Sequence, residues 1–439
     1  MEKPIYDTFC CPYCQSKKYV RRGFRQKKYE KIQLYLCLEC KRTFTPQKDL
    51  GKHYPLETVF NALSLYNLGH SLGGVCKILN DRESGEIRNF SLQPSTVSAW
   101  LEEFKDYCKY QRMREFVIKK YDPKNTVVTA TLAHRQLYRY RYHRAKCSLM
   151  IQEEYAHRKF EPLKEFLELV PSECPHQYFS EGLRASEVPI TFSKKQMIVR
   201  SKTNYANKLC QFVLQSVKER TSRHEHVQKF FLFNDSVTVA TEVPVYLTRE
   251  DLLHMQTQLG FQIYTKKIDL INLIDLISKE NPNPNEQKEI KLLALKLGFK
   301  ELEIGDYLGR LEISAIRNFA HTQLDVKSFG ELPKLITGHI DLLQIRNGQI
   351  HILDYKPNAV KEQPIDQLTI YAMALSRLTG LRLFDFKCAW FDEKDYFEFY
   401  PLHVLYKPSK TRRRKTVATT EGRYRINQEV KKVVNVKPT

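Results

Sequence analysis

Alternating apolar and polar residues predict a β-hairpin near the end of the chain. The segments 340–345 and 349–355 alternate, and Asn347-Gly348 between them is typical of a two-residue type I′ turn. Across 201–403 a long helix (204–231), a strand (237–247), a helical insertion (248–335), this hairpin, another helix and a second hairpin follow one another. That order predicts a mixed α/β domain.

Apolar residues at helical spacing predict three helices within 53–110. The first covers 56–68 and ends at Gly69, the second covers 71–79, and the third opens at Gln93-Pro94. The inward side chains of the third helix are Val97, Trp100, Leu101 and Phe104, and its outward ones are Ser95, Thr96, Ser98 and Ala99. The outward residues suit the recognition helix of a DNA-binding helix-turn-helix. A plain helical bundle is the alternative, because 81–92 makes a long turn.

The remaining patterns complete a multidomain chain. We expect the following parts: a ribbon-like segment at 1–50, the helices at 53–110, a mostly helical, basic connecting region at 111–200, the α/β domain at 201–403, and a flexible basic tail at 404–439. Within the connecting region, 134–146 interleaves Tyr with Arg, which suits either base stacking or half-buried strand packing.

Charge adds a partner to this picture. The 439 residues include 71 Lys and Arg against 50 acids, a formal net charge of +21, which favours nucleic acid. Arg412, Arg413 and Arg414 in the tail are candidate phosphate contacts, and a solvated tail is the alternative.

We find no export signal and no long apolar stretch, so we expect a cytoplasmic, nucleoid-associated protein without a membrane partner, and a homodimer is possible.

Two Cys-x-x-Cys pairs lie in the basic N-terminal segment. Cys11, Cys14, Cys37 and Cys40 can close a tetrahedral, structural Zn²⁺ site, and so short a segment has too little core to fold without one. Unligated thiols are the alternative. Cys10 also precedes the first pair, but only Cys11 has the two-residue gap to Cys14. The pattern up to Cys-x-x-Cys-Lys-Arg-Thr-Phe resembles the zinc ribbon of insertion-sequence transposases, in which a helix ending in T-V-x-x-W-L also follows the ribbon.

The predicted hairpin carries a candidate catalytic site. The two-residue period of a strand puts Asp354 and Lys356 on one face, and Asp341 lies on the other strand. The two carboxylates and the carbonyl of Tyr355 can hold Mg²⁺ or Mn²⁺, and Lys356 can polarise water or stabilise developing charge. The alternative, solvent-exposed strand charges, fits poorly with the apolar run before Asp354.

These residues resemble the PD-(D/E)XK nuclease superfamily, in particular its RecB-type branch. The motifs are G-x-x-D at Gly338–Asp341, D-x-K at Asp354–Lys356 and Q-x-x-x-Y at Gln367–Tyr371. The resemblance implies a restriction-endonuclease-like α/β core in which Gln367 and Tyr371 face the nucleic-acid backbone. It also implies a further acid near the metal, for which Glu242 and Glu225 are candidates, with His226 as an alternative to Glu225. An iron-sulfur cluster is rejected because Cys147, Cys174, Cys210 and Cys388 lack close spacing.

The combined reading is a Mg-dependent DNA endonuclease, targeted to duplex DNA by a zinc ribbon and a helix-turn-helix. The ribbon suggests a link to a mobile element in a prokaryotic or viral context. A DNA-binding regulator with a catalytically silent nuclease fold is one alternative, and a transposase with three acids on an RNase H-like sheet is another.

Overall fold

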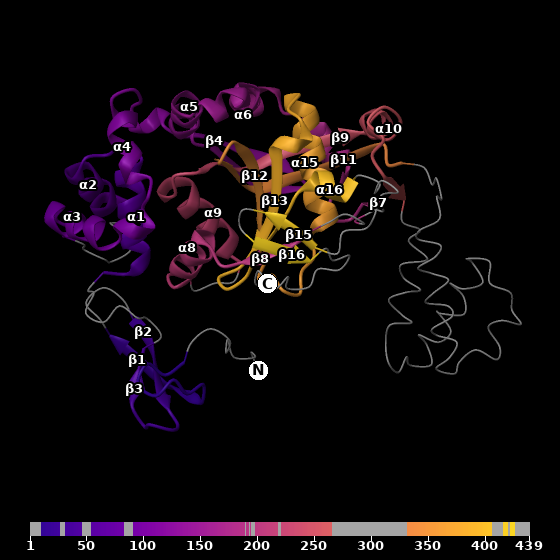
Figure 1. Ribbon diagram of the computed structural model, residues 1–439. Coiled ribbons are helices and arrows are strands. Elements are labelled where there is room, and N and C mark those ends of the chain that lie inside the picture. The colour runs from indigo at the N-terminus through magenta and orange to yellow at the C-terminus, as the bar shows by residue number, and fades with distance from the viewer. Residues whose placement is uncertain are drawn as a thin grey trace, which may run out of the picture. The chain divides into compact units, whose positions relative to one another are not determined.

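The computed structural model describes residues 10–26, 31–45, 54–82, 91–265 (without 189, 193, 195–197 and 218–220), 332–405, 416–419 and 422–425. The chain divides into two compact units. Figure 1 labels the helices and strands along the chain. The first unit comprises 1–128, 143–149 and 204–239, and the second comprises 129–142, 150–203 and 240–439.

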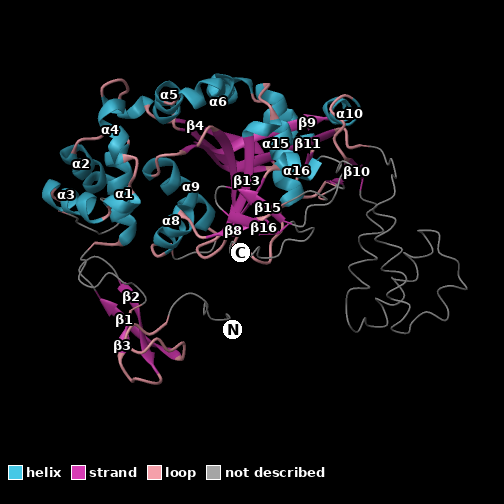
Figure 2. Ribbon diagram, in the orientation of Figure 1, coloured by secondary structure: helices cyan, strands magenta, loops and turns pink. Residues whose placement is uncertain are grey.

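A small antiparallel sheet begins the first unit. Its strands are β1 (Tyr19–Gln26), β2 (Lys31–Cys37) and β3 (Thr43–Phe44), in that order (Figure 2). The rings of Tyr19 and Phe44 meet edge to face with centroids 5.6 Å apart, and Cys11 and Cys37 are buried beside them. This core is very small, as the sequence predicted.

Three helices follow, as the apolar spacing predicted. They are α1 (Leu56–Asn67), α2 (Leu72–Arg82) and α3 (Pro94–Glu103). Gly69, with φ +111°, follows the end of α1, a conformation that favours glycine. The predicted inward residues of α3, namely Val97, Trp100, Leu101 and Phe104, are all buried.

The rest of the first unit is helical. It holds α4 (Gln111–Ile118), the start of α5 (Arg144–Glu153), α8 (Tyr205–Leu214) and α9 (Arg223–Asn234). The single helix expected at 204–231 is wrong: the chain makes two helices, and the Asn204 side chain caps the first. Buried Asn234 ties α9 to α1, since its Oδ1 accepts from Asn67 at 2.8 Å and its Nδ2 donates to Ser64 at 3.0 Å.

A nine-stranded mixed sheet organises the second unit. Eight strands follow the order β4-β5-β9-β11-β12-β13-β14-β8, and β6 pairs with β11 in parallel. Their bounds are β4 Val128–His134, β5 Gln136–Tyr142, β6 Leu183–Arg184, β8 Arg200–Lys202, β9 Thr238–Thr248, β11 Leu335–Arg346, β12 Gln349–Tyr355, β13 Phe386–Phe391 and β14 Tyr396–Phe399. The hairpin predicted at 340–355 is therefore confirmed as β11–β12, and the second predicted hairpin is confirmed as β13–β14.

Helix α15 (Ile365–Thr379) connects β12 to β13, which run parallel, and it packs on both of them (Figure 1). The expected alternation of 349–355 does not lead to alternating burial, because every residue of β12 after Gln349 is buried. A strand is buried on both faces when other elements cover both sides of the sheet, and α15 covers one side of β12. Asp354 is thus a buried carboxyl.

The connecting region 111–200 is less helical than predicted, because β4 and β5 belong to the large sheet. Its helices in the second unit are α6 (Glu161–Glu173) and α7 (His176–Glu181). Short 3-10 helices lie at Lys105–Tyr107, Pro123–Asn125, Tyr155–Phe160 and Leu383–Asp385. The error has a physical cause: pairing with β9 is a non-local contact that local periodicity does not show.

The insertion and the tail are described in part. The insertion begins with α10 (Arg249–Thr257) and β10 (Ile263–Thr265), which pairs with β7 (Ile190–Phe192), and 266–331 lie outside the described residues. After α16 (Pro401–Leu405) the tail is not wholly irregular, since β15 (Thr416–Thr419) pairs with β16 (Gly422–Arg425). In the described part of the chain, no helix combines the length and apolarity needed to cross a bilayer.

Candidate functional site

The hairpin β11–β12 brings two carboxylates face to face. Its turn residues Asn347 and Gly348 have φ values of 52° and 68°, as a type I′ turn requires. The register pairs Leu342 with Leu353, so one step further it sets Asp341 opposite Asp354. The backbone N–H of Tyr355 donates to Oδ2 of Asp341 at 3.3 Å, which fixes the first carboxylate beside the second strand.

Asp354 is a strongly perturbed acid. Only 3% of the residue is exposed. Burial raises its pKa well above the ordinary value, and the charge of Asp341 and a hydrogen bond with it raise the pKa further. With little water around them, Asp341 and Asp354 can both be ionised only if a positive charge lies nearby. The pair therefore favours the binding of a cation.

Lys356 supplies one such charge. Its Nζ lies 3.1 Å from Oδ2 of Asp354, and 24% of its side chain is exposed, compared with 5% for Asp354. Burial alone would lower the pKa of Lys356, but the charges of Asp354 and Asp341 outweigh it and raise the pKa above its usual value. Lys356 therefore carries its positive charge at neutral pH and lies beside the two carboxylates.

Helix α15 adds a second layer to this site. Gln367 and Tyr371 are one turn apart, and Nε2 of Gln367 donates to the hydroxyl of Tyr371 at 2.8 Å. Burial raises the pKa of Tyr371, and the negative charges of Asp354, Asp341 and Glu242 raise it further. Tyr371 is buried, so of the two residues the half-buried Gln367 is the one open to solvent.

Glu242 on β9 belongs to the same neighbourhood. It is half-buried and has a left-handed φ of 51° within the strand. Burial raises the pKa of Tyr138 on β5, and the charges of Glu242 and Asp341 raise it further, which places both acids near one ring. A non-glycine residue at positive φ in a strand is a costly conformation. Glu225, the other candidate acid, lies on α9 in the first unit.

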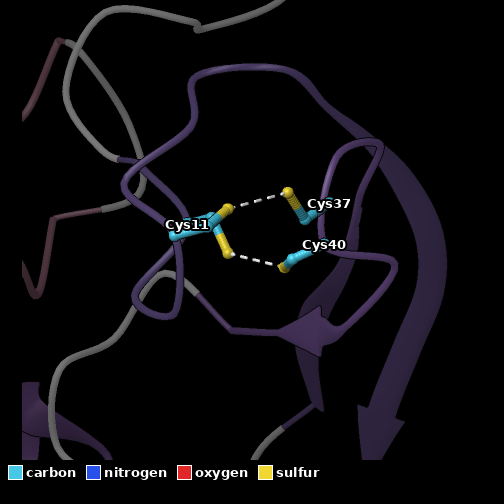
Figure 3. Close-up of side chains that lie close together, drawn as sticks. Cys11, Cys37 and Cys40 are labelled. Carbon is cyan, nitrogen blue, oxygen red and sulfur yellow. Dashed lines mark hydrogen bonds between the residues drawn. The ribbon is translucent and has the colours of Figure 1, made fainter.

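The N-terminal cysteines form a compact cluster. Sγ of Cys11 lies 3.6 Å from that of Cys40, Sγ of Cys14 lies 3.5 Å from that of Cys37, and all four sulfurs are within 4.8 Å of one another. Figure 3 shows Cys11, Cys37 and Cys40 pointing toward one centre. A Zn–S bond of about 2.3 Å gives tetrahedral sulfur separations of about 3.8 Å, so the donor set fits zinc. Cys10 lies apart and donates to the Gln15 side chain at 2.9 Å.

The outward face of α3 is exposed at three of its four predicted positions. Ser95, Ser98 and Ala99 are exposed and Thr96 is half-buried. Arg412, Arg413 and Arg414 lie outside the described residues.

Comparison with known proteins gives a family match for the segment that carries the first of these sites. Residues 261–435 match the family model of the PD-(D/E)XK nuclease superfamily. The matched segment contains Asp341, Asp354, Lys356, Gln367 and Tyr371, whereas Glu242 and the first unit precede it. The searches of curated proteins and of solved structures each gave no match.

One group of residues was missed by the sequence analysis. His134 at the end of β4, Cys174 and His176 before and at the start of α7, and His339 on β11 come together in the second unit. The close spacing of Cys174 and His176 was a usable signal, but the link to His134 and His339 exists only in the fold.

Proposed function

We propose that this protein is a metal-dependent DNA endonuclease whose site is built on the β11–β12 hairpin. The observation that carries the proposal is the placement of Asp341 opposite Asp354, with the ammonium of Lys356 3.1 Å from the latter. The match of 261–435 to a nuclease superfamily supports the reaction class.

Asp341, Asp354 and the carbonyl of Tyr355 would hold the ion, Mg²⁺ or Mn²⁺. The raised pKa of Asp354 supports this assignment, because a buried carboxyl beside another acid is stabilised as a carboxylate by a divalent cation. When bound, such an ion lowers the pKa of water and neutralises charge on the phosphate.

Four further residues belong to the proposed site. Lys356 orients the attacking water and stabilises the negative charge that develops on the phosphoryl oxygens. Gln367 reaches the nucleic-acid backbone, and Tyr371, which is buried, positions Gln367 through the hydrogen bond between them. Glu242 completes the acidic side of the site.

The first unit is the proposed targeting part. The four-cysteine cluster would hold structural Zn²⁺ and keep the small sheet folded. Ser95, Thr96 and Ser98 present hydroxyls on the outward face of α3, and the net charge of +21 favours a polyanion. Duplex DNA, Arg412–Arg414 as phosphate contacts, a homodimer, a nucleoid location and a mobile-element origin belong to this proposal.

A plasmid assay tests the proposal. We expect the full chain to cut DNA with Mg²⁺ or Mn²⁺ and not with EDTA, and Asp354→Ala to bind DNA without cutting it. Glu165→Ala, which changes an exposed acid on α6, is the matched control and should cut at the wild-type rate. Wild-type cleavage by Asp354→Ala would rule the site out. A wild-type chain that binds DNA and cuts in neither metal would support the silent regulator instead.

A further inference from the structure

A second set of metal-ligating side chains lies in the second unit. Nε2 of His134 is 2.8 Å from Nδ1 of His176 and 3.9 Å from Sγ of Cys174. The ligand atoms of these three residues all lie within 4.8 Å of one another. We infer that His134, Cys174 and His176 bind one transition-metal ion of the zinc class, at a site separate from both the cysteine cluster and the carboxylate pair.

The donor set determines the kind of ion. Two imidazoles and one thiolate suit Zn²⁺ and similar soft or borderline ions, whereas Mg²⁺ and Mn²⁺ prefer oxygen ligands. Three protein ligands leave one tetrahedral position. His134 is buried, Cys174 is half-buried and His176 is exposed, so solvent reaches the site and a water molecule would supply the fourth ligand.

The surroundings hold the ligands in place. The Phe179 ring stacks on His134 with centroids 4.0 Å apart and planes 10° apart. The Arg135 guanidinium donates to the carbonyls of Ser180 and Gly182 at 3.0 and 2.9 Å, which fixes the end of α7. A site whose ligands are locked by packing binds a metal without a large ordering cost.

His134 also has the outer partner that ligating histidines usually have. Its Nδ1 lies 2.9 Å from Nε2 of His339, which leaves Nε2 of His134 to face Cys174 and His176. A hydrogen bond at the second ring nitrogen fixes the tautomer and orientation of a metal-binding imidazole. A metal-free chain of hydrogen-bonded histidines explains the two N–N distances, but it gives no reason for the thiol of Cys174 to converge on the same nitrogen.

The site would stabilise the strand that carries Asp341. His339 stands two residues before Asp341 on β11, and the Tyr138 ring stacks on it with centroids 3.5 Å apart. Metal binding at His134 therefore holds the end of β4 to β11 through His339, which is a positioning residue. The metal site does not depend on the nuclease proposal, since its ligands and its test are independent of cleavage.

Zinc content of the purified full chain tests the inference. We expect wild-type protein to hold one more zinc per chain than Cys174→Ser or His176→Ala. His254→Ala, which changes an exposed histidine on α10, should keep the wild-type content. His339→Ala should weaken zinc binding at this site by about 10-fold to 100-fold, as loss of an outer partner does. Equal zinc content in wild type and His176→Ala would overturn the inference.

Cobalt spectroscopy gives a second measurement that does not depend on those variants. In a full chain carrying Cys11→Ser and Cys14→Ser, the four-cysteine site is disabled. Co²⁺ should still give tetrahedral ligand-field bands with weak thiolate charge transfer, as one sulfur and two nitrogens produce. Absence of those bands would show that the histidines form a hydrogen-bonded chain only.

Discussion

The ring of Tyr371 occupies the space that a side chain at Gly338 would need. A β carbon on Gly338 would overlap Cε1 of the tyrosine and lie 3.0 Å from Cζ and 3.1 Å from the hydroxyl. The glycine of the G-x-x-D motif thus lets α15 approach β11 closely enough for Tyr371 to reach the acids. The G-x-x-D motif and the Q-x-x-x-Y motif therefore pack directly against each other, through Gly338 and Tyr371.

Replacing Gly338 by alanine should therefore act through Tyr371. We expect Gly338→Ala to destabilise the second unit by about 1–3 kcal/mol, as overpacking of a core does. The chain has two tryptophans, and Trp390 lies in this unit, so denaturant unfolding of a Trp100→Phe background can be followed by Trp390 fluorescence. In a double-mutant cycle, Tyr371→Ala should remove most of the cost of the alanine. Additive effects would mean that the ring is not the obstacle.

Substitutions of the two carboxylates and of Lys356 should have different effects on metal binding and on the cleavage rate. Asp341→Ala or Asp354→Ala deletes a metal ligand and should slow cleavage by about 10³-fold or more. Lys356→Ala keeps both ligands, so we expect metal binding by calorimetry to persist while the rate falls by about 10²-fold or more. Gln367→Ala should reduce the cleavage rate by less than either of these changes. Loss of metal binding in Lys356→Ala would assign the lysine to the ion rather than to the phosphate.

Local chemistry was enough to predict the hairpin and its acids. Asn347-Gly348 specifies its turn by backbone conformation alone, and two-residue periodicity then sets Asp354 beside Lys356. The helices at 56–68 and from 94 were equally legible, because their buried residues recur at helical spacing. These features depend only on neighbours in sequence.

Apart from the division of the helix expected at 204–231 into α8 and α9, the errors and omissions involve distant contacts. The periodicity of β12 did not predict its burial on both faces, because facial burial depends on elements distant in sequence that pack over the sheet. Strand β5 pairs with β9 across about 100 residues, so the Tyr and Arg residues at 134–146 were compatible with a strand but did not show which sheet it joins. His134 and His339, separated by 205 positions, meet only because β4 and β11 lie in that same sheet. The charge of Glu242 acts near Tyr371 for the same reason.

Zinc removal should unfold the small sheet. Its core within the described residues comprises Cys11, Tyr19, Cys37 and Phe44, with Tyr35 and Cys40 against it, so metal ligation supplies most of its folding free energy. We expect strong chelation, or Cys14→Ser, to make 10–45 susceptible to protease while the second unit stays intact. Cys10→Ser is the control. Protease resistance of the chelated ribbon would show that these thiols are structural without metal.

DNA binding should weaken steeply with salt, because phosphate contacts release counterions. Ser95→Ala with Ser98→Ala should reduce the preference for the specific site and leave the salt dependence unchanged, since hydroxyls on α3 would read bases. Titrations at several salt concentrations with specific and random duplexes measure both. Equal losses on the two duplexes would assign α3 to backbone contact or to packing alone.

Lys146 in the first unit is a buried amine surrounded by main-chain carbonyls. Its Nζ lies 2.6, 2.6 and 2.9 Å from the carbonyl oxygens of Leu232, Asp235 and Thr238, and the residue is 0% exposed. These contacts join α5 to the end of α9 and the start of β9. Burial lowers its pKa to about 7, so above that pH the neutral amine donates two hydrogen bonds to the three carbonyls.

We therefore expect Lys146→Met to destabilise the first unit in a pH-dependent way. At pH about 8.5, losing both hydrogen bonds leaves buried carbonyls unpaired, at a cost of about 1–3 kcal/mol each. Below pH about 7 the folded unit must bury a charge. In the unfolded chain Lys146 keeps its proton up to the ordinary pKa of 10.5, whereas in the folded unit it loses the proton above about 7. The free energy of unfolding contributed by Lys146 therefore rises with pH from about 7 upward. The loss of that free energy in Lys146→Met should accordingly become smaller toward pH about 6. Trp100 fluorescence in a Trp390→Phe background reports unfolding of this unit, with exposed Lys119→Met as the control. A loss that is equal at both pH values would mean that Lys146 stays an ammonium throughout and binds all three carbonyls.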